Sequence, residues 1–159
     1  MRTHSIALVS FCTAVVGCTY SHSVWGDRFQ VYRPKGADLE PAMRVTNNYK
    51  LKTQGNIRVG ADDLHWWLDE KKVTVRFCFE SVDGQSVYVM LEDVTLEVRP
   101  AGLVWKWPGS GRVSSGKEMK WVSLAYRVAQ LPFDVTFRLT VPFRKPNGAA
   151  EEVVFDFAP

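Results

Sequence analysis

The sequence predicts an all-β protein, a single antiparallel β-sandwich that is immunoglobulin-like or similar. Residue usage is the first reason: 22 Val, 9 Phe, 5 Tyr and 6 Trp stand against only 11 Ala and 11 Leu. Branched and aromatic side chains suit a pleated, half-buried surface. Several segments also alternate apolar and polar residues, and turn signals separate them. The length of 159 residues, 46% of them hydrophobic and 23% charged, fits one globular domain.

The N-terminal segment has the pattern of an export signal. Arg2 supplies a positive charge, and Ile6 to Val16 form an apolar run that is too short to span a bilayer as a helix. The run ends in Val15-Val16-Gly17-Cys18, which resembles the lipobox of bacterial lipoproteins: an aliphatic residue, a small or aliphatic one, Gly or Ala, then Cys. The alternatives are an ordinary cleaved signal and a buried N-terminal strand.

The resemblance implies that the Cys18 sulfur receives diacylglycerol, that the signal is cleaved before Cys18, and that the new N-terminus carries a further acyl chain such as palmitate. Two or three acyl chains are enough for stable anchoring. We therefore expect a signal peptide at 1–17, a lipidated tether at 18–23 and a sandwich domain at 24–159. Lipoproteins retained at the inner membrane usually carry Asp after the modified Cys. Thr19 at that position predicts the outer membrane, facing the periplasm, in a Gram-negative cell.

Removal of the signal leaves 19 Lys and Arg against 17 Asp and Glu, a net charge of +2. This charge is too small and too dispersed for a nucleic-acid-binding surface, so no nucleic-acid partner is expected. With Cys18 lipidated, Cys78 has no intramolecular partner for a disulfide. Stability must then come from the hydrophobic core, in spite of an oxidising location.

The elements are predicted in chain order from period-two alternation and turn residues. Val24 to Tyr32 can form a first strand, and the polar stretch from Pro34 to Lys52 is interpreted as a long loop with at most short structure. Leu64 to Leu68 is expected to form a hairpin with the strand that begins at Val73, while a short helix over Asp62 to Lys72 is the competing interpretation. Further strands are predicted at Val73–Glu80, Asp93–Arg99, Lys117–Val128, Phe133–Val141 and Val153–Phe157.

Motifs for catalysis or for a cofactor are weak. Gly111 to Lys117 has the spacing of a phosphate-binding loop, but Glu118 follows where a Ser or Thr hydroxyl would bind magnesium. No cluster of His and Cys has metal-ligand spacing, and no serine lies in a nucleophile elbow. Cys78 is a conceivable thiol nucleophile, yet it lies in mid-strand between two phenylalanines. We expect no enzyme activity, no cofactor and no metal; a thiol-dependent enzyme is the third-ranked hypothesis.

The tryptophans are the candidate binding residues. Trp66 and Trp67 are adjacent, so in a strand one of the two must face away from the core. Trp105 and Trp107 share one strand face beside a Pro-Gly turn. Exposed indoles can anchor a protein interface, stack on sugars or rest at lipid headgroups. The first hypothesis is a non-catalytic interaction module that docks an envelope protein, and the second is a module that binds peptidoglycan or another envelope glycan.

Overall fold

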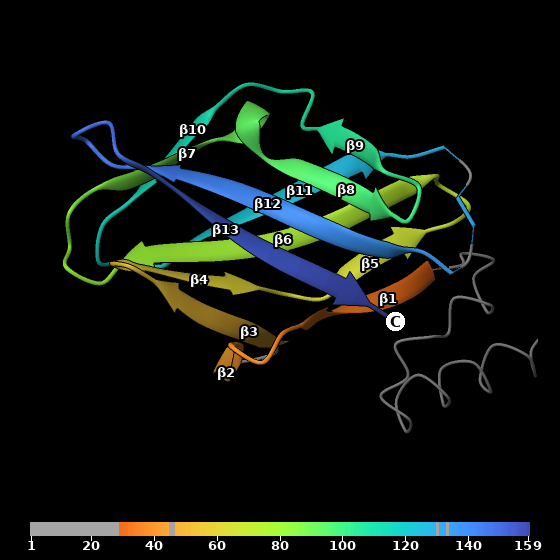
Figure 1. The fold of residues 1–159 in the computed structure, drawn as a ribbon, viewed down its shortest axis with the longest axis horizontal. Coiled ribbons are helices and arrows are strands. Elements are labelled where there is room, and N and C mark those ends of the chain that lie inside the picture. Colours follow the sequence, from red (N-terminus) through yellow and green to blue (C-terminus); the bar gives the residue numbers. More distant parts are fainter. Residues whose placement is uncertain (1–28, 45–46, 130, 133) are drawn as a thin grey trace, which may run out of the picture.

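A computed structural model describes residues 29–44, 47–129, 131–132 and 134–159. The lipobox, Cys18 and the tether at 18–23 lie outside the described residues. The described residues form strands and one short 3₁₀ helix, η1 (Leu91–Asp93) (Figure 1). The strands are β1 (Phe29–Lys35), β2 (Glu40–Arg44), β3 (Asn47–Gln54), β4 (Ile57–Ala61), β5 (Leu64–Trp67), β6 (Lys72–Ser81), β7 (Val87–Met90), β8 (Thr95–Arg99), β9 (Leu103–Lys106), β10 (Arg112–Ser115), β11 (Lys120–Arg127), β12 (Thr136–Arg144) and β13 (Ala150–Ala158). No helix in the described part is long and apolar enough to cross a membrane.

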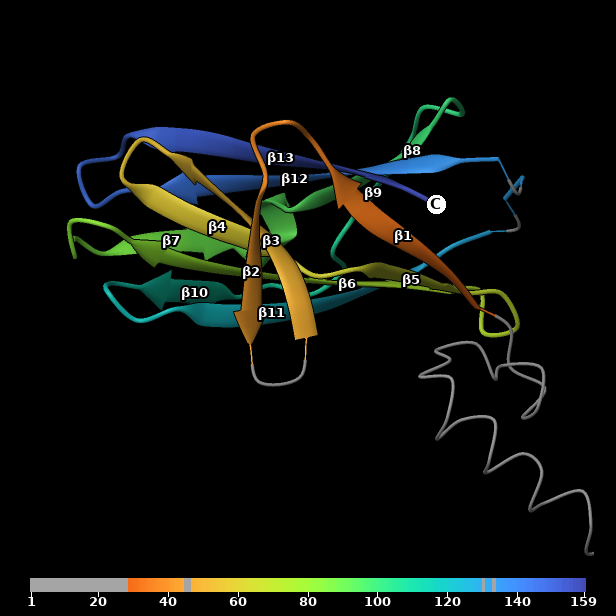
Figure 2. The ribbon, with the colours of Figure 1, turned by 90° about the horizontal axis from the view of Figure 1, so that it is seen from below.

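The strands form two antiparallel layers that face each other as a sandwich (Figure 2). The first layer contains β2, β3, β4, β5, β6 and β11; the second contains β7, β8, β9, β10, β12 and β13. β1 joins the layers, because Phe29 to Tyr32 pair with β5 and Arg33 to Lys35 pair with β13. The prediction of an all-β sandwich is thus confirmed.

The core lies between the layers and is built from the inward half of each alternating pattern. In β6 the residues Val73, Val75, Phe77 and Phe79 are at most 1% exposed. They face the fully buried Phe137, Leu139, Val141 and Phe143 of β12, and Phe79 meets Phe143 edge-on at 5.1 Å between ring centroids. Burial of apolar surface on this scale supplies the main driving force for folding.

Most of the predicted strands are found, with boundaries shifted by a few residues; of the first, Val24 to Tyr32, positions 24–28 lie outside the described residues and the rest lie in β1. The pair β5 and β6 forms the expected hairpin, in which His65 pairs with Thr74, and the competing short helix over Asp62 to Lys72 is wrong. The Gly111–Lys117 segment, which has the spacing of a phosphate-binding loop, contains strand β10, which pairs with β7.

The prediction of a long loop over Pro34 to Lys52 is wrong, because β2 and most of β3 lie there as a hairpin at the edge of the first layer. The pattern in β3, the strand next to edge strand β2, is inverted relative to a strand whose inward residues are apolar. Lys52 pairs with the core residue Val59 and so lies on the inward face, while Leu51 pairs with Gly60 on the outward face. A search for inward apolar residues therefore misses this strand.

Candidate functional site

One row of neighbouring residues crosses the outer face of the first layer, from β1 to β11, which pairs with β6 alone in the described part of the chain. The antiparallel registers pair Phe29 with Trp67, Trp67 with Lys72 and Lys72 with Arg127. The row therefore reads aromatic, aromatic, cation, cation across β1, β5, β6 and β11. Directly opposed side chains in a sheet lie close enough to interact.

The two adjacent tryptophans of β5 separate as alternation requires. Trp66 is 3% exposed and packs edge-on against Phe137 in the core, with 6.4 Å between ring centroids. Trp66 is thus a core residue and offers no surface on which a ligand could stack. We therefore remove Trp66 from the candidate binding residues. Trp67 lies on the outer face and is half-buried.

Trp67 is held in one orientation by its neighbours. Its Nε1 donates a hydrogen bond to Thr74 Oγ1 at 3.0 Å, and its ring lies 4.9 Å from that of Phe29. The His65 ring stacks at 6.2 Å, and Lys72 Nζ lies 5.9 Å from the indole centroid. Cation and indole at this distance attract each other electrostatically. The indole is therefore a fixed part of the outer face.

Trp105 and Trp107 lie at the edge of the second layer, in and just after β9. Trp105 pairs with the core residue Leu96, so its ring is on the inward side of that layer. Trp107 meets Tyr126 of β11 at 6.3 Å and nearly at a right angle. The segment from Trp105 to Pro108 thus approaches β11 across the gap between the layers. It bounds a cavity of about 380 Å³, lined by Lys72, Trp105, Lys106, Trp107, Pro108, Ala125, Tyr126 and Arg127.

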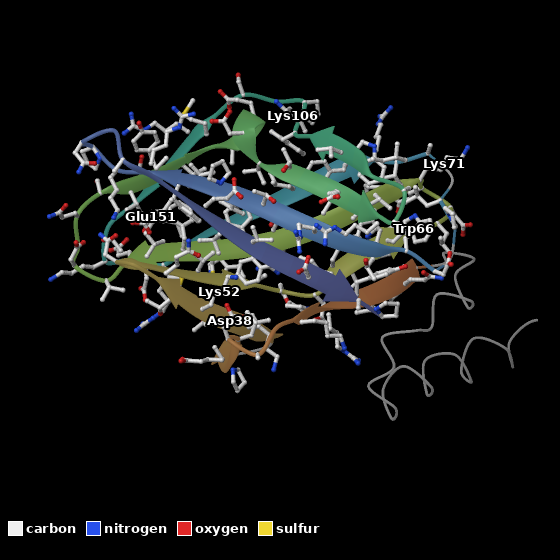
Figure 3. The ribbon with its side chains drawn as sticks, in the orientation of Figure 1. Asp38, Lys52, Trp66, Lys71, Lys106 and Glu151 are labelled. Atoms are coloured by element: carbon white, nitrogen blue, oxygen red, sulfur yellow. The ribbon has the colours of Figure 1, made fainter. Side chains whose placement is uncertain are left out.

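The charged residues that line this Trp cavity are all cations. Lys72 forms an ion pair with Glu70. Lys106 and Arg127 have no ion-pair partner among the described residues, and both are exposed (Figure 3 labels Lys106). Burial raises the pKa of the Tyr126 phenol, so this side chain is neutral at physiological pH. The cavity therefore combines aromatic rings with positive charge and has no carboxylate in its lining.

β9 leaves one backbone edge unpaired in the described part of the chain, since it pairs with β8 alone. Its first two residues are apolar and exposed: Leu103 is 46% exposed and Val104 is 56% exposed. An exposed edge with apolar side chains is a template for another strand. The Trp cavity and this edge share Trp105 and Lys106. Together we call them the β9 site.

Cys78 is fully buried, and its surroundings explain why. It lies in a cross-strand row with Leu51, Gly60 and Trp121 on the outer side of β6. A methyl group built on Gly60 would lie 2.7 Å from the Cys78 sulfur, so the missing side chain of Gly60 makes room for the thiol. Neighbouring residues on the outer side of the sheet cover Cys78. Its side chain is therefore buried although it points away from the core between the layers. The Cys78 side chain has no exposed surface in the described structure.

A second cavity, of about 560 Å³, lies where β1 leaves β5 and is lined in part by Arg33, Lys50 and Asp63. Burial, with a contribution from the Asp62 carboxylate, raises the pKa of Asp63. Asp62 itself points to Arg76, with 3.7 Å between Asp62 Oδ2 and Arg76 Nη1. The adjacent carboxylates thus have different partners and do not converge on one point. No group of three potential metal ligands occurs in the described part.

Comparison with known proteins adds little to this geometry. No protein-family model matches the sequence, and no curated protein matches it either. Among solved structures, it is similar to one described as the X-ray structure of Northeast Structural Genomics Consortium target SoR45, with 8% sequence identity, 83% of each chain covered and a TM-score of 0.34. A likeness at this level carries no argument about function.

The structure brings together three of the four tryptophans that the sequence singled out. Lys72 joins them, because it lies next to Trp67 and also lines the cavity of Trp105 and Trp107. Sequence reasoning missed Phe29, Lys72, Lys106 and Arg127. The pairing register that aligns them is a long-range property, so no local signal identifies them. The Lys106 side chain between two tryptophans was the one local hint of a mixed aromatic and cationic surface.

Proposed function

We propose that this protein is a lipid-anchored lipoprotein of the cell envelope and that it acts as a non-catalytic protein-interaction module. The β9 site carries the proposal: an unpaired strand edge with exposed Leu103 and Val104, next to a cavity lined by Trp105 and Trp107. Tryptophan and arginine are enriched where protein interfaces obtain most of their binding energy. Addition of a strand to a free edge is a common mode of recognition.

The anchor is tested by Cys18→Ser. This variant should lose acylation and accumulate either as unprocessed precursor or as protein released from the membrane. The readouts are the mass of the isolated chain and its fractionation with membranes. Cys78→Ser is the matched control, because it removes the buried thiol and should leave acylation and fractionation unchanged. A Cys18→Ser chain that is still processed and still bound to the membrane would contradict the lipoprotein proposal.

The partner is tested by a photo-crosslinking amino acid at position 104, introduced in cells. Val104 lies at the β9 site, and Val154 provides a control position on the outer face of β13. One discrete adduct should form from position 104 and not from 154, and the purified partner should reproduce it. Adducts of equal yield at both positions would indicate chance encounters and contradict the interaction module.

Glycan binding is the second candidate, and the half-buried indoles of Trp105 and Trp107 favour it. Flat aromatic faces beside cations suit a sugar that carries carboxylates. The test is a titration of the purified chain with peptidoglycan fragments while tryptophan fluorescence is recorded. A change that Trp107→Ala abolishes supports the glycan. No change at millimolar fragment removes this candidate.

A further inference from the structure

We propose that the partner segment is an extended, acidic strand that pairs with the free edge of β9 and places carboxylates at Arg127 and Lys106. This inference rests on the proposed interaction function and adds the chemistry of the partner. The inference rests on the unpaired backbone edge of β9 and on a Trp cavity whose charged lining residues are all cations. Side-chain alternation in an added strand then decides which residues of the partner enter the cavity.

The backbone of β9 sets the shape of the partner. Leu103 to Lys106 pair with Val98 to Thr95 of β8, and in the described chain no strand pairs with the opposite edge of β9. Each strand presents hydrogen-bonding groups along both edges. A segment that satisfies the free edge over this length is therefore extended. An added helix would leave the β9 backbone groups without partners.

Alternation decides which partner side chains enter the cavity. In β9 Trp105 is on the inward side of its layer, and its neighbours Val104 and Lys106 are on the outward side. In a strand added to this edge, every second side chain shares the side of Trp105, and the others share the side of Val104 and Lys106. One set thus enters the Trp cavity, which Arg127 also lines, and the other meets the aliphatic side chain of Val104 and the ammonium group of Lys106.

Charge selects acidic residues for the partner. Arg127 and Lys106 have no carboxylate partner among the described residues, whereas the third cation of the lining, Lys72, is paired with Glu70. A basic partner strand would place like charges together, which is unfavourable. Arg can hold a carboxylate with two parallel hydrogen bonds. Opposite charge beside an aromatic wall therefore favours two adjacent Glu or Asp residues, one on each face of the added strand, flanked by small or apolar residues.

The test uses the mature chain as isolated from cells and a synthetic, end-capped hexapeptide in which two adjacent Glu residues are flanked on each side by Thr, so that each face of the strand carries one carboxylate. Two control peptides have the same length: one carries Gln in place of Glu, and one carries N-methyl groups on alternate backbone nitrogens. Binding is followed by NMR through the backbone signals of residues 103–107 and the tryptophan indole N–H signals. We expect the acidic peptide to bind at about 1 mM or tighter, with affinity that falls as salt is added.

Three variants of the chain complete the experiment. Lys106→Gln and Arg127→Gln should each weaken the binding about threefold, since each removes one partly exposed charge pair. Lys120→Gln is the matched control, because Lys120 lies at the other end of β11 and pairs with Glu118. Its affinity for the peptide should equal that of the unaltered chain.

Equal binding of the N-methylated peptide would overturn strand pairing, and equal binding of the Gln peptide would overturn the charge requirement. If a uronic-acid oligosaccharide shifts the indole signals while the Glu peptide does not, the site takes a glycan and the inference is wrong. A defined crosslink at position 104 without binding of the Glu peptide would retain the interaction module and remove only the acidic strand.

Discussion

Lys52 of β3 donates a hydrogen bond from Nζ to the backbone carbonyl of Val154 in β13, at 2.5 Å and across 102 positions of sequence (Figure 3 labels Lys52). Gln54 donates in the same way to the carbonyl of Glu152 at 2.8 Å. β1 pairs with β13 only from Asp156 onward, so these side chains satisfy carbonyls that β1 does not reach. Side chains thereby complete the contact between the two layers where the backbone ladder ends.

Lys52→Met should lower the free energy of unfolding by about 1–3 kcal/mol, because the partly buried Val154 carbonyl would lose its donor. Methionine keeps most of the apolar length of lysine, so the loss reports the hydrogen bond and the charge beside Asp38. Urea unfolding measures the change. Lys120→Met, at a lysine whose side chain is 46% exposed, should shift stability by less than about 0.5 kcal/mol. Equal losses in the two variants would contradict this role of Lys52.

Gly60→Ala should destabilise the sandwich by about 1–3 kcal/mol, because the new methyl group has no room. It would lie 2.7 Å from Cys78 Sγ and 2.9 Å from carbons of Leu51 and Tyr49. Cys78→Ala in the same chain should recover part of the loss, and thermal unfolding can compare both. Gly116→Ala is the control, since its nearest contact would be at 3.5 Å. A Gly60→Ala chain as stable as the control would show that the contact is not close.

Trp66→Ala should lower the free energy of unfolding by about 3–5 kcal/mol, whereas Trp67→Ala should lower it by about half as much or less. Trp66 is buried in the core, and Trp67 is half-buried on the outer face, where its removal leaves an open surface. Denaturant titration of both variants gives the comparison. If Trp67→Ala lowered the free energy of unfolding more than Trp66→Ala, the register of β5 would be shifted by one residue.

Alkaline pH should destabilise the protein through its buried phenols. Burial raises the pKa of Tyr32 from 10.0 to about 12. A phenol with a raised folded-state pKa stabilises the fold fully below pH 10, and this contribution is lost as the pH rises towards 12. Each unit of pKa difference corresponds to about 1.4 kcal/mol, so the loss from Tyr32 reaches at most about 3 kcal/mol. Urea unfolding at pH 9 and pH 11.5 measures it, and Tyr32→Phe should show a smaller fall between these two values.

Alternation predicted the strands whose inward faces are apolar and failed where the pattern is inverted. β6 and β12 were recognisable because Phe77 and Phe137 lie in period-two series of core residues. β3 was missed because its inward residues are Lys52 and Gln54, which bind backbone carbonyls of the other layer. β3 lies one strand in from the edge strand β2, and its inward Lys52 is tolerated because it finds an acceptor in the opposite layer. Its partner, however, lies about a hundred positions away and leaves no local trace.

The sequence alone determined the fold class and the candidate status of Trp67, Trp105 and Trp107, because alternation, turn residues and residue type are local properties. It also predicted the lipid anchor at Cys18, which lies outside the described residues. Only the tertiary structure decided that Trp66 belongs to the core, that Gly60 makes room for Cys78, and that Lys72 joins Trp67 to the Trp cavity. The physical reason is register: pairing between distant strands sets which side chains meet, and neighbours in sequence carry no record of it.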